Sequence, residues 1–162
     1  MLQGYEERFY PSQAWVCTRS GGFRSLFRYI SGDNDRGRKT TFVMNFDEFQ
    51  LFSDQKIDMT VPVMMTESEK GSEMCFYITK EFQSNPPRPS GSGVYLSQKK
   101  AMSVYAMSMG GYPNMAVEAQ KLREKLERGR ASQVDFSTYM SMSYDSPWKV
   151  VNRRNDVLYK KL

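Results

Sequence analysis

The chain contains no histidine. This absence excludes a Ser-His-acid triad, the usual ligand sets of zinc enzymes, and any site in which a histidine of this sequence binds iron. Only two cysteines are present, Cys17 and Cys75, and neither belongs to a CxxC motif. We therefore expect neither a zinc site nor a disulfide framework, and we predict two buried free thiols.

Long apolar runs are absent as well. No stretch approaches the roughly 18 apolar residues of a membrane-spanning helix, and the opening residues carry no apolar signal core. We expect a soluble, cytoplasmic protein. The formal charge of +5 favours anionic partners. Because no long basic run occurs, a solvated mixed surface is favoured over nucleic-acid binding.

What is present is the composition of one folded domain, residues 1–162. The chain is 40% hydrophobic and 14% aromatic, which is typical of a globular protein and excludes a disordered one. Its length suffices for one core and is too short for two ordinary domains.

Two helices are predicted from apolar periodicity. Phe23, Leu26, Phe27 and Ile30 lie at i, i+3, i+4 and i+7 and predict a first helix that ends before Gly32. A second helix follows Gly111, and its shared apolar face and its end are indicated by the residues Met115, Ala119, Leu122, Leu126 and Gly129.

Alternating and β-favouring residues predict the strands. They are expected over Tyr5–Phe9, Ala14–Thr18, Ile57–Val63, Met74–Thr79, Val94–Leu96, Met102–Met109, Thr138–Tyr144, Trp148–Val151 and Asp156–Lys160.

The predicted order repeats on either side of a loop at 84–93, which is rich in proline, glycine and serine. The pseudo-repeats cover about 5–83 and 94–162. We therefore predict an α+β fold in which a duplicated strand-helix-strand-strand unit forms a mostly antiparallel, distorted β-barrel flanked by two α-helices, with a cleft between the units.

Five segments stand out in order along the chain: YEERFYPSQAWV, GFRSLFRYISGDN, KIDMTVPVMM, NPPRPSGSGVYL and YDSPWKVVNRRNDV. Together they extend from Tyr5 to about Tyr159, and they resemble the conserved blocks of the SOUL heme-binding proteins. The resemblance implies a barrel-like sheet with two helices. It also implies non-catalytic binding or transport of heme or protoporphyrin in a surface apolar groove.

The chain departs from the family pattern in length on both sides of the first predicted helix: it is shorter between Thr18 and Gly22 and longer between Arg38 and Lys56. An apolar insert at residues 39–55 is expected to form an extra strand or a lid near the first predicted helix. Phe9 stands where some family members place a histidine, so heme bound here lacks histidine ligation. Met59, Met64, Tyr144 and Cys17 are alternative axial ligands, and a site with no axial ligand is equally acceptable.

A porphyrin is an apolar disc with two propionates at one edge, so its site needs apolar walls and one or two cations. Arg24 and Arg28, at i and i+4, are candidate partners for the propionates, although periodicity alone favours a solvated helix face for them. Lys56 is a third, weaker candidate.

The candidate walls of the groove come from two regions. Leu26, Phe27 and Ile30 would form one wall, and Tyr144 and Trp148 the other. Core packing is favoured for Phe27 and Ile30, because apolar stripes at helical spacing are usually buried. Ligand contact is favoured for Trp148, because loops carry function more often.

Two other function classes stay open. In the first, a protein partner contacts the insert and the basic end of the chain, which contains Arg153, Arg154, Lys160 and Lys161. In the second, the fold is a hydrolase that uses Glu67, Glu69 or Asp145 with Tyr144. No pair of acids has a spacing that demands catalysis, so a non-enzymatic protein without catalytic or metal residues is favoured.

Overall fold

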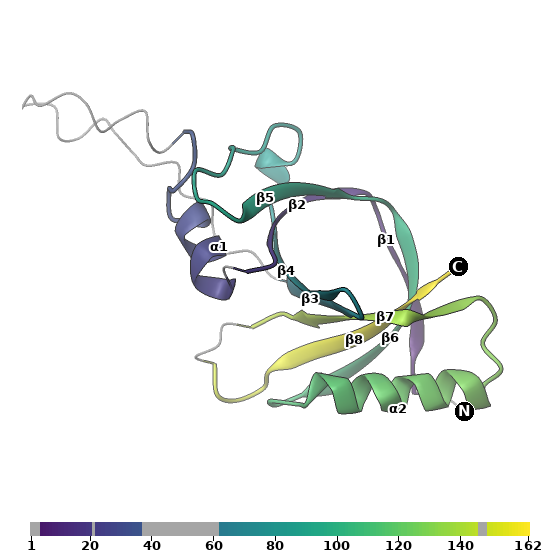
Figure 1. Ribbon diagram of the computed structural model, residues 1–162. Coiled ribbons are helices and arrows are strands. Elements are labelled where there is room, and N and C mark those ends of the chain that lie inside the picture. Colours follow the sequence, from purple (N-terminus) through teal and green to yellow (C-terminus); the bar gives the residue numbers. More distant parts are fainter. Residues whose placement is uncertain (1–3, 21, 37–61, 146–148) are drawn as a thin grey trace, which may run out of the picture.

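The chain folds into one antiparallel sheet with two helices packed against it (Figure 1). The computed structural model describes residues 4–20, 22–36, 62–145 and 149–162. In order, the elements are β1 (Glu6–Tyr10), β2 (Gln13–Thr18), α1 (Gly22–Ile30), β3 (Val63–Ser68), β4 (Gly71–Tyr77), a 3-10 turn (Lys80–Phe82), β5 (Val94–Lys99), β6 (Met102–Gly110), α2 (Met115–Arg128), β7 (Val134–Ser143) and β8 (Arg154–Lys161).

Two of the predicted strands are not observed over their full length. Most of the strand predicted at Ile57–Val63 lies outside the described residues, as does the insert at 39–55, and β3 begins only at Val63. The prediction of a strand over Trp148–Val151 is wrong for residues 149–151. The next residue, Asn152, has a φ of 53°, a left-handed conformation that turns the backbone just before β8.

The strands pair in the order β1-β6-β8-β7-β3-β4-β2-β5, and every pair is antiparallel. The predicted α+β class and antiparallel sheet are therefore confirmed. The predicted barrel is not confirmed, because the order begins at β1 and ends at β5 and is not closed. Pro11 lies in the break between β1 and β2, as expected of a residue without a backbone N–H. The duplication stays a prediction.

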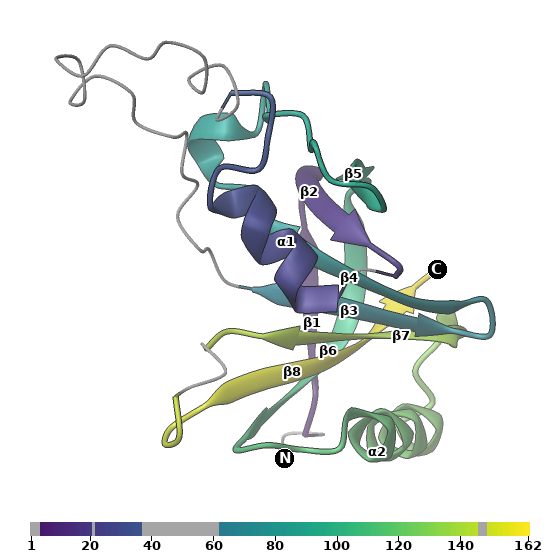
Figure 2. The same cartoon turned by 60° about the vertical axis from the view of Figure 1, so that its left-hand side comes forward.

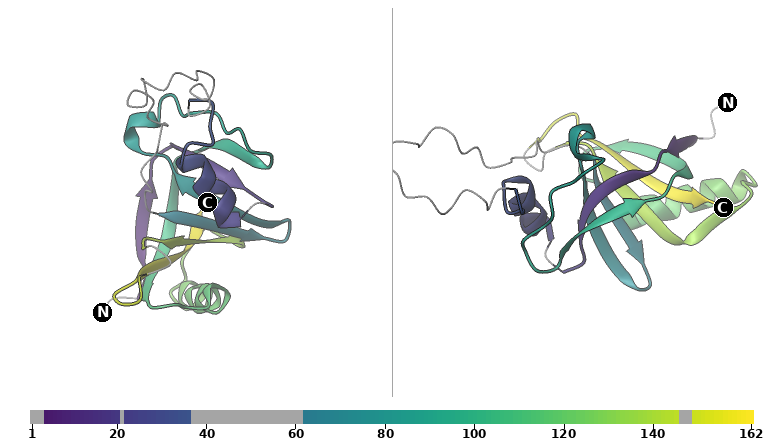
Figure 3. Two further views of the ribbon diagram at one scale, coloured as in Figure 1. Left: turned by 90° about the vertical axis from the view of Figure 1, so that its left-hand side faces the viewer. Right: turned by 90° about the horizontal axis from the view of Figure 1, so that it is seen from above.

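The sheet is strongly curved, and both of its faces are covered (Figures 1, 2 and 3). Successive residues of a strand point to opposite faces, which divides the core into clusters. One cluster lies under α1, where Leu26 and Ile30 meet Phe76. A second lies under α2, where Leu122 and Leu126 meet residues of β6 and β8. The third, here called the inner cluster, has no helix and is formed by Trp15, Cys17, Met64, Cys75, Val104, Ala106, Met140, Met142 and Leu158.

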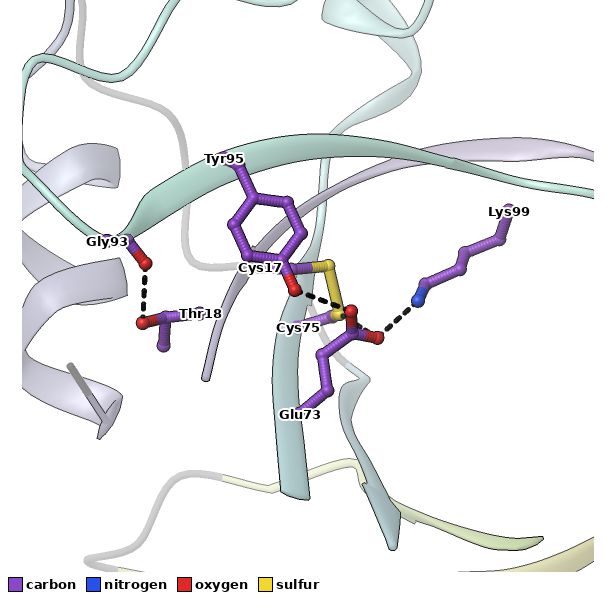
Figure 4. Close-up of a disulfide and its surroundings, with 7 residues drawn as sticks. All are labelled: Cys17, Thr18, Glu73, Cys75, Gly93, Tyr95 and Lys99. Atoms are coloured by element: carbon purple, nitrogen blue, oxygen red, sulfur yellow. Dashed lines mark hydrogen bonds and ion pairs between the residues drawn. A yellow bond between two sulfur atoms is a disulfide. The ribbon is translucent and has the colours of Figure 1, made fainter. Parts of the chain in front are cut away.

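The two cysteines form a disulfide, so the prediction of free thiols is wrong, although their burial is confirmed (Figure 4). Cys17 on β2 and Cys75 on β4 are directly opposite in the strand register, with their Cα atoms 4.1 Å apart. Antiparallel pairing of β2 with β4 therefore brings the two side chains together on one face of the sheet. The pairing went unpredicted because 58 residues separate the two positions in the sequence.

Helix α2 has a strong N-terminal cap. The side-chain oxygen of Asn114 accepts hydrogen bonds from the backbone N–H groups of Ala116 and Val117, at 3.1 and 3.3 Å. We expect Asn114→Ala to lower the free energy of unfolding by about 1 kcal/mol, because the two N–H groups lose their acceptor. Urea denaturation measures the change. Asn114→Asp, which keeps an acceptor, should stay near wild type, and equal stability of both variants would contradict the capping role.

Candidate functional site

The face that α1 turns to solvent carries an aromatic ring and two cations. Phe27 is 43% exposed, and its ring stacks on that of Phe23 with centroids 6.0 Å apart. Arg24 and Arg28 are exposed on the same helix. Arg28 pairs with Asp33 at 3.2 Å, at the turn that ends α1. An apolar surface with guanidinium groups beside it therefore exists on α1.

The other apolar residues of α1 lie beneath that surface. Leu26 and Ile30 are buried against β2 and β4, so core packing is confirmed for Ile30. It is wrong for Phe27, because α1 turns Leu26, Tyr29 and Ile30 toward the sheet and leaves Phe27 outside. Leu26 and Ile30 thus hold the helix in place rather than offer an accessible wall.

The connection between β7 and β8 carries a second exposed apolar surface, formed by Val150 and Val151. The chain that leads into β8 lies on the same side of the molecule as α1 in Figure 1. Asp145 accepts a hydrogen bond from the backbone N–H of Arg154 at 2.7 Å and pairs with Lys149 at 2.5 Å. The hydrogen bonds from Lys149 and Arg154 lower the pKa of Asp145 below its usual value.

Tyr144 does not lie with the α1 residues. It packs against the inner cluster, where its hydroxyl lies 3.6 Å from the Met142 sulfur. The Arg154 guanidinium lies 4.9 Å from the centre of its ring. Burial, followed by hydrogen bonds with Tyr10 and Asp156, raises the pKa of Tyr144. Tyr144 therefore faces the interior, and the other candidates Lys56 and Trp148 lie outside the described residues.

The space enclosed by the curved sheet is occupied by the protein's own side chains. Trp15, Met64, Met142 and Leu158 are at most 4% exposed and fill its centre. Asp156, also fully buried, accepts hydrogen bonds from Arg8 at 2.5 Å and Ser108 at 2.6 Å. The interior is thus a packed core with a satisfied ion pair.

One polar cavity lies at the edge of this core and was missed by sequence reasoning. Its volume is about 280 Å³, and its lining includes the cations Arg19, Lys70 and Lys99 and the carboxylate of Glu73. Burial raises the pKa of Glu73, but hydrogen bonds from Lys99 and Tyr95 outweigh it and hold the pKa below its usual value. The lining comes from β3, β4, β5, the turn between β3 and β4, and Arg19 just after β2, so no local sequence motif predicts the cavity.

Comparison with known sequences identifies the fold and family. Residues 1–160 match the family described as SOUL heme-binding protein. The chain belongs to the SOUL family. The resemblance seen in its five sequence segments is therefore confirmed over nearly the whole chain.

Relatives of this SOUL chain are named for heme. Human heme-binding protein 2 is 30% identical to it, in a match that covers 94% of this chain and 76% of the relative. Bovine heme-binding protein 1 is also 30% identical, and the match covers 82% of this chain and 64% of the relative. The chain thus spans slightly less than two thirds of the bovine protein.

Solved structures share the fold of this SOUL chain at low sequence identity. The C-terminal domain of EcmrR superposes with a TM-score of 0.57 at 10% identity, over 98% of both chains. A hydrolase from Listeria innocua gives a TM-score of 0.53 at 13% identity, over 98% of this chain and 91% of that one. At such identities the likeness shows the fold alone. Within the part of the chain that the structure describes, no helix is long and apolar enough to cross a membrane.

Proposed function

We propose that the chain binds heme or a related tetrapyrrole, without catalysis, on the exposed face of α1. The observation that carries the proposal is the exposed ring of Phe27 beside the exposed guanidinium groups of Arg24 and Arg28. A porphyrin stacks on an aromatic surface, and guanidinium groups form paired hydrogen bonds with its propionates. Family membership and the heme-binding names of the relatives support the same ligand.

The opposite wall of the groove is assigned to the β7–β8 connection. Val150 and Val151 are 75% and 72% exposed. Exposed neighbouring apolar side chains are suited to cover the second face of a planar ligand. Trp148, two residues earlier in the chain, is proposed to join this wall, and Lys56 is proposed as a further cation for a propionate. Tyr144 supports the connection from inside, next to Arg154.

Binding is proposed to depend on shape and propionate pairing, without histidine ligation. The chain has no histidine, so none of its residues supplies the most common axial ligand. We therefore expect metal-free protoporphyrin to bind about as tightly as hemin. A much weaker affinity for protoporphyrin would show that a residue of this chain ligates the iron.

Absence of catalysis is supported by the surroundings of the candidate acids and bases. The pKa of Asp145 is lowered by Lys149 and Arg154, and the pKa of Tyr144 is raised by burial. Both groups thus move away from the range in which they would exchange protons near neutral pH. Glu67 accepts a hydrogen bond from Ser72 on the neighbouring strand, which accounts for its position.

The alternative, a protein-interaction module, is less favoured because cations of its proposed surface already have partners within the chain. Arg153 lies 4.5 Å from the centre of the Tyr112 ring, and Lys161 pairs with Glu7 at 2.8 Å. Much of the basic end is thus used within the chain. An oligomer that shows no spectral change with hemin would favour this alternative.

A titration with matched variants tests the proposed site. Hemin and protoporphyrin are added to the purified chain and followed by Soret absorbance and tryptophan fluorescence. Reversing both charges, Arg24→Glu with Arg28→Glu, should weaken binding about tenfold or more, because two charge-assisted hydrogen bonds are lost and the propionates are repelled. Phe27→Ala should weaken the binding of hemin and of protoporphyrin to the same extent.

The control makes the same change of charge on the other helix. Lys121 and Arg128 are exposed on α2, which packs against a different part of the sheet (Figure 3). Lys121→Glu with Arg128→Glu should leave the affinity near wild type. Equal losses in the two double variants would overturn the α1 site and leave only a general effect of charge.

A further inference from the structure

Three side chains with metal-binding atoms meet at the inner face of the sheet, away from the proposed tetrapyrrole site (Figure 4). The sulfur atoms of Cys17 and Cys75 and a carboxylate oxygen of Glu73 all lie within 4.8 Å of one another. Glu73 precedes Cys75 by two residues on β4, so both side chains point to the same face. Strand register therefore brings two sulfurs and one oxygen together.

These three groups match the ligand set of a zinc-type site once the disulfide between the two cysteines has been reduced. Zinc in proteins binds thiolate sulfur and carboxylate oxygen, with four ligands in a tetrahedral arrangement. Both cysteines are fully buried, and the Glu73 carboxylate lies 3.5 Å from the Cys75 sulfur. Glu73 also lines the cavity of about 280 Å³, from which water would supply the fourth ligand.

We propose that reduction of the Cys17–Cys75 disulfide creates a binding site for a thiophilic divalent cation, held by Cys17, Cys75 and Glu73. A dithiol reductant gives two electrons and two protons to the disulfide and becomes a disulfide itself. The sulfur–sulfur bond breaks and two thiols form. The cation then displaces one proton from each thiol to solvent and binds two thiolates and the Glu73 carboxylate. When a small-molecule disulfide accepts two electrons from the two thiolates and takes up two protons to become a dithiol, the protein disulfide re-forms and the cation is released.

The groups around Glu73 define what the cation must displace. The Lys99 ammonium forms an ion pair with the Glu73 carboxylate, and the Tyr95 hydroxyl donates a hydrogen bond to it at 2.6 Å (Figure 4). Lys99 thus competes with the cation for Glu73 and also repels it. Removing the Lys99 charge should therefore tighten metal binding, which a merely structural role of Glu73 does not predict.

Cobalt(II) is the probe, because its thiolate complexes absorb visible and near-ultraviolet light. The reduced chain, prepared with a phosphine reductant and freed of excess reagent, is titrated with cobalt chloride. We expect a thiolate-to-cobalt absorption band that saturates at one equivalent and is abolished by zinc. The oxidised chain keeps the fold without free thiols and should give no band. A reduced chain that gives no band overturns the proposal.

Variants of the proposed ligands and of neighbouring residues distinguish groups that bind the metal from groups that only lie near it. Cys17→Ser should abolish the band, and Glu73→Gln should weaken cobalt binding about tenfold or more while keeping a partner for Tyr95. Lys99→Gln should tighten it by a similar factor. Lys70→Gln is the matched control, because Lys70 lines the same cavity without pairing with Glu73. A band that survives Cys17→Ser, or equal effects of the two lysine variants, would overturn the assignment.

Discussion

Replacing Asp156 with alanine should lower the free energy of unfolding by about 3–5 kcal/mol, the typical effect of breaking a buried ion pair. The Asp156 side chain is fully buried, and it accepts hydrogen bonds from Arg8 and Ser108 at 2.5 and 2.6 Å. The Arg8 side chain is only 17% exposed. The alanine variant therefore leaves a nearly buried guanidinium group without its buried counter-charge and with only the 61% exposed Glu6 carboxylate as an ion-pair partner, and this poorly compensated charge dominates the loss.

Urea denaturation measures the loss, and two further variants identify its cause. Arg8→Met with Asp156→Leu removes both charges and should recover much of the stability, because no charge is then buried alone. Glu7→Ala breaks the surface pair with Lys161 and should change stability by less than about 1 kcal/mol. If Asp156→Ala and Glu7→Ala had equal effects, the buried pair would have no special weight.

The Asp156 carboxylate also makes the free energy of unfolding depend on pH in the acid range. Burial raises the pKa of Asp156, but hydrogen bonds from Ser108, Tyr144 and Arg8 outweigh it and hold the pKa below its usual value. A carboxyl whose pKa is lower in the folded state stabilises the fold above its unfolded pKa of about 3.9. That contribution is lost as the pH falls below about 4 and through the folded pKa. Asp156→Asn should lack this part of the acid destabilisation.

Local periodicity was sufficient to predict both helices and the buried face of α2, but only part of the buried face of α1. The spacing of Phe23, Leu26 and Ile30 placed α1 correctly, because an amphipathic stripe is a local property. The same spacing included Phe27 in the stripe and passed over Tyr29. In the structure Tyr29 is buried, because its hydroxyl donates to the Pro87 carbonyl at 2.7 Å, and Phe27 turns outward. The sequence contains no sign of that distant acceptor.

Contacts between distant residues were beyond prediction for the same reason. Arg8 and Asp156 come from opposite ends of the chain and meet because β6 pairs with both β1 and β8. Cys17 and Cys75 meet through the register of β2 and β4. Alternation along a strand indicates that two faces exist but specifies neither the partner strand nor the register. The inner ion pair and the disulfide therefore required the strand order.

The candidate site was predicted in part. Family resemblance directed attention to α1 and to the β7–β8 connection, and the exposed Arg24 and Arg28 keep their proposed role. Tyr144 was expected to face α1 but packs inside, next to Met142. Because both faces of the sheet are covered, burial does not distinguish its inward residues from its outward ones, and sequence alone could not orient Tyr144.

Reducing the disulfide should lower the free energy of unfolding by about 2–4 kcal/mol without unfolding the chain. The bond joins residues separated by 58 positions, so reducing it restores freedom to a long loop of the unfolded state. In the folded state β2 and β4 stay paired through their backbone, and Cys17 and Cys75 remain buried. Urea denaturation with and without a phosphine reductant measures the change.

The variant Cys17→Ala with Cys75→Ala is the control, and it should respond to neither reductant nor zinc. Reduced wild type should regain stability as zinc is added, because a cation that binds the folded form shifts the equilibrium toward that form. The gain should increase with the logarithm of zinc concentration above the dissociation constant measured with cobalt competition. Equal stability of oxidised and reduced wild type would mean that the cross-link contributes nothing. If zinc stabilised the double alanine variant, the metal would bind elsewhere in the chain. The cysteine pair would then act as a cross-link but not as a metal site.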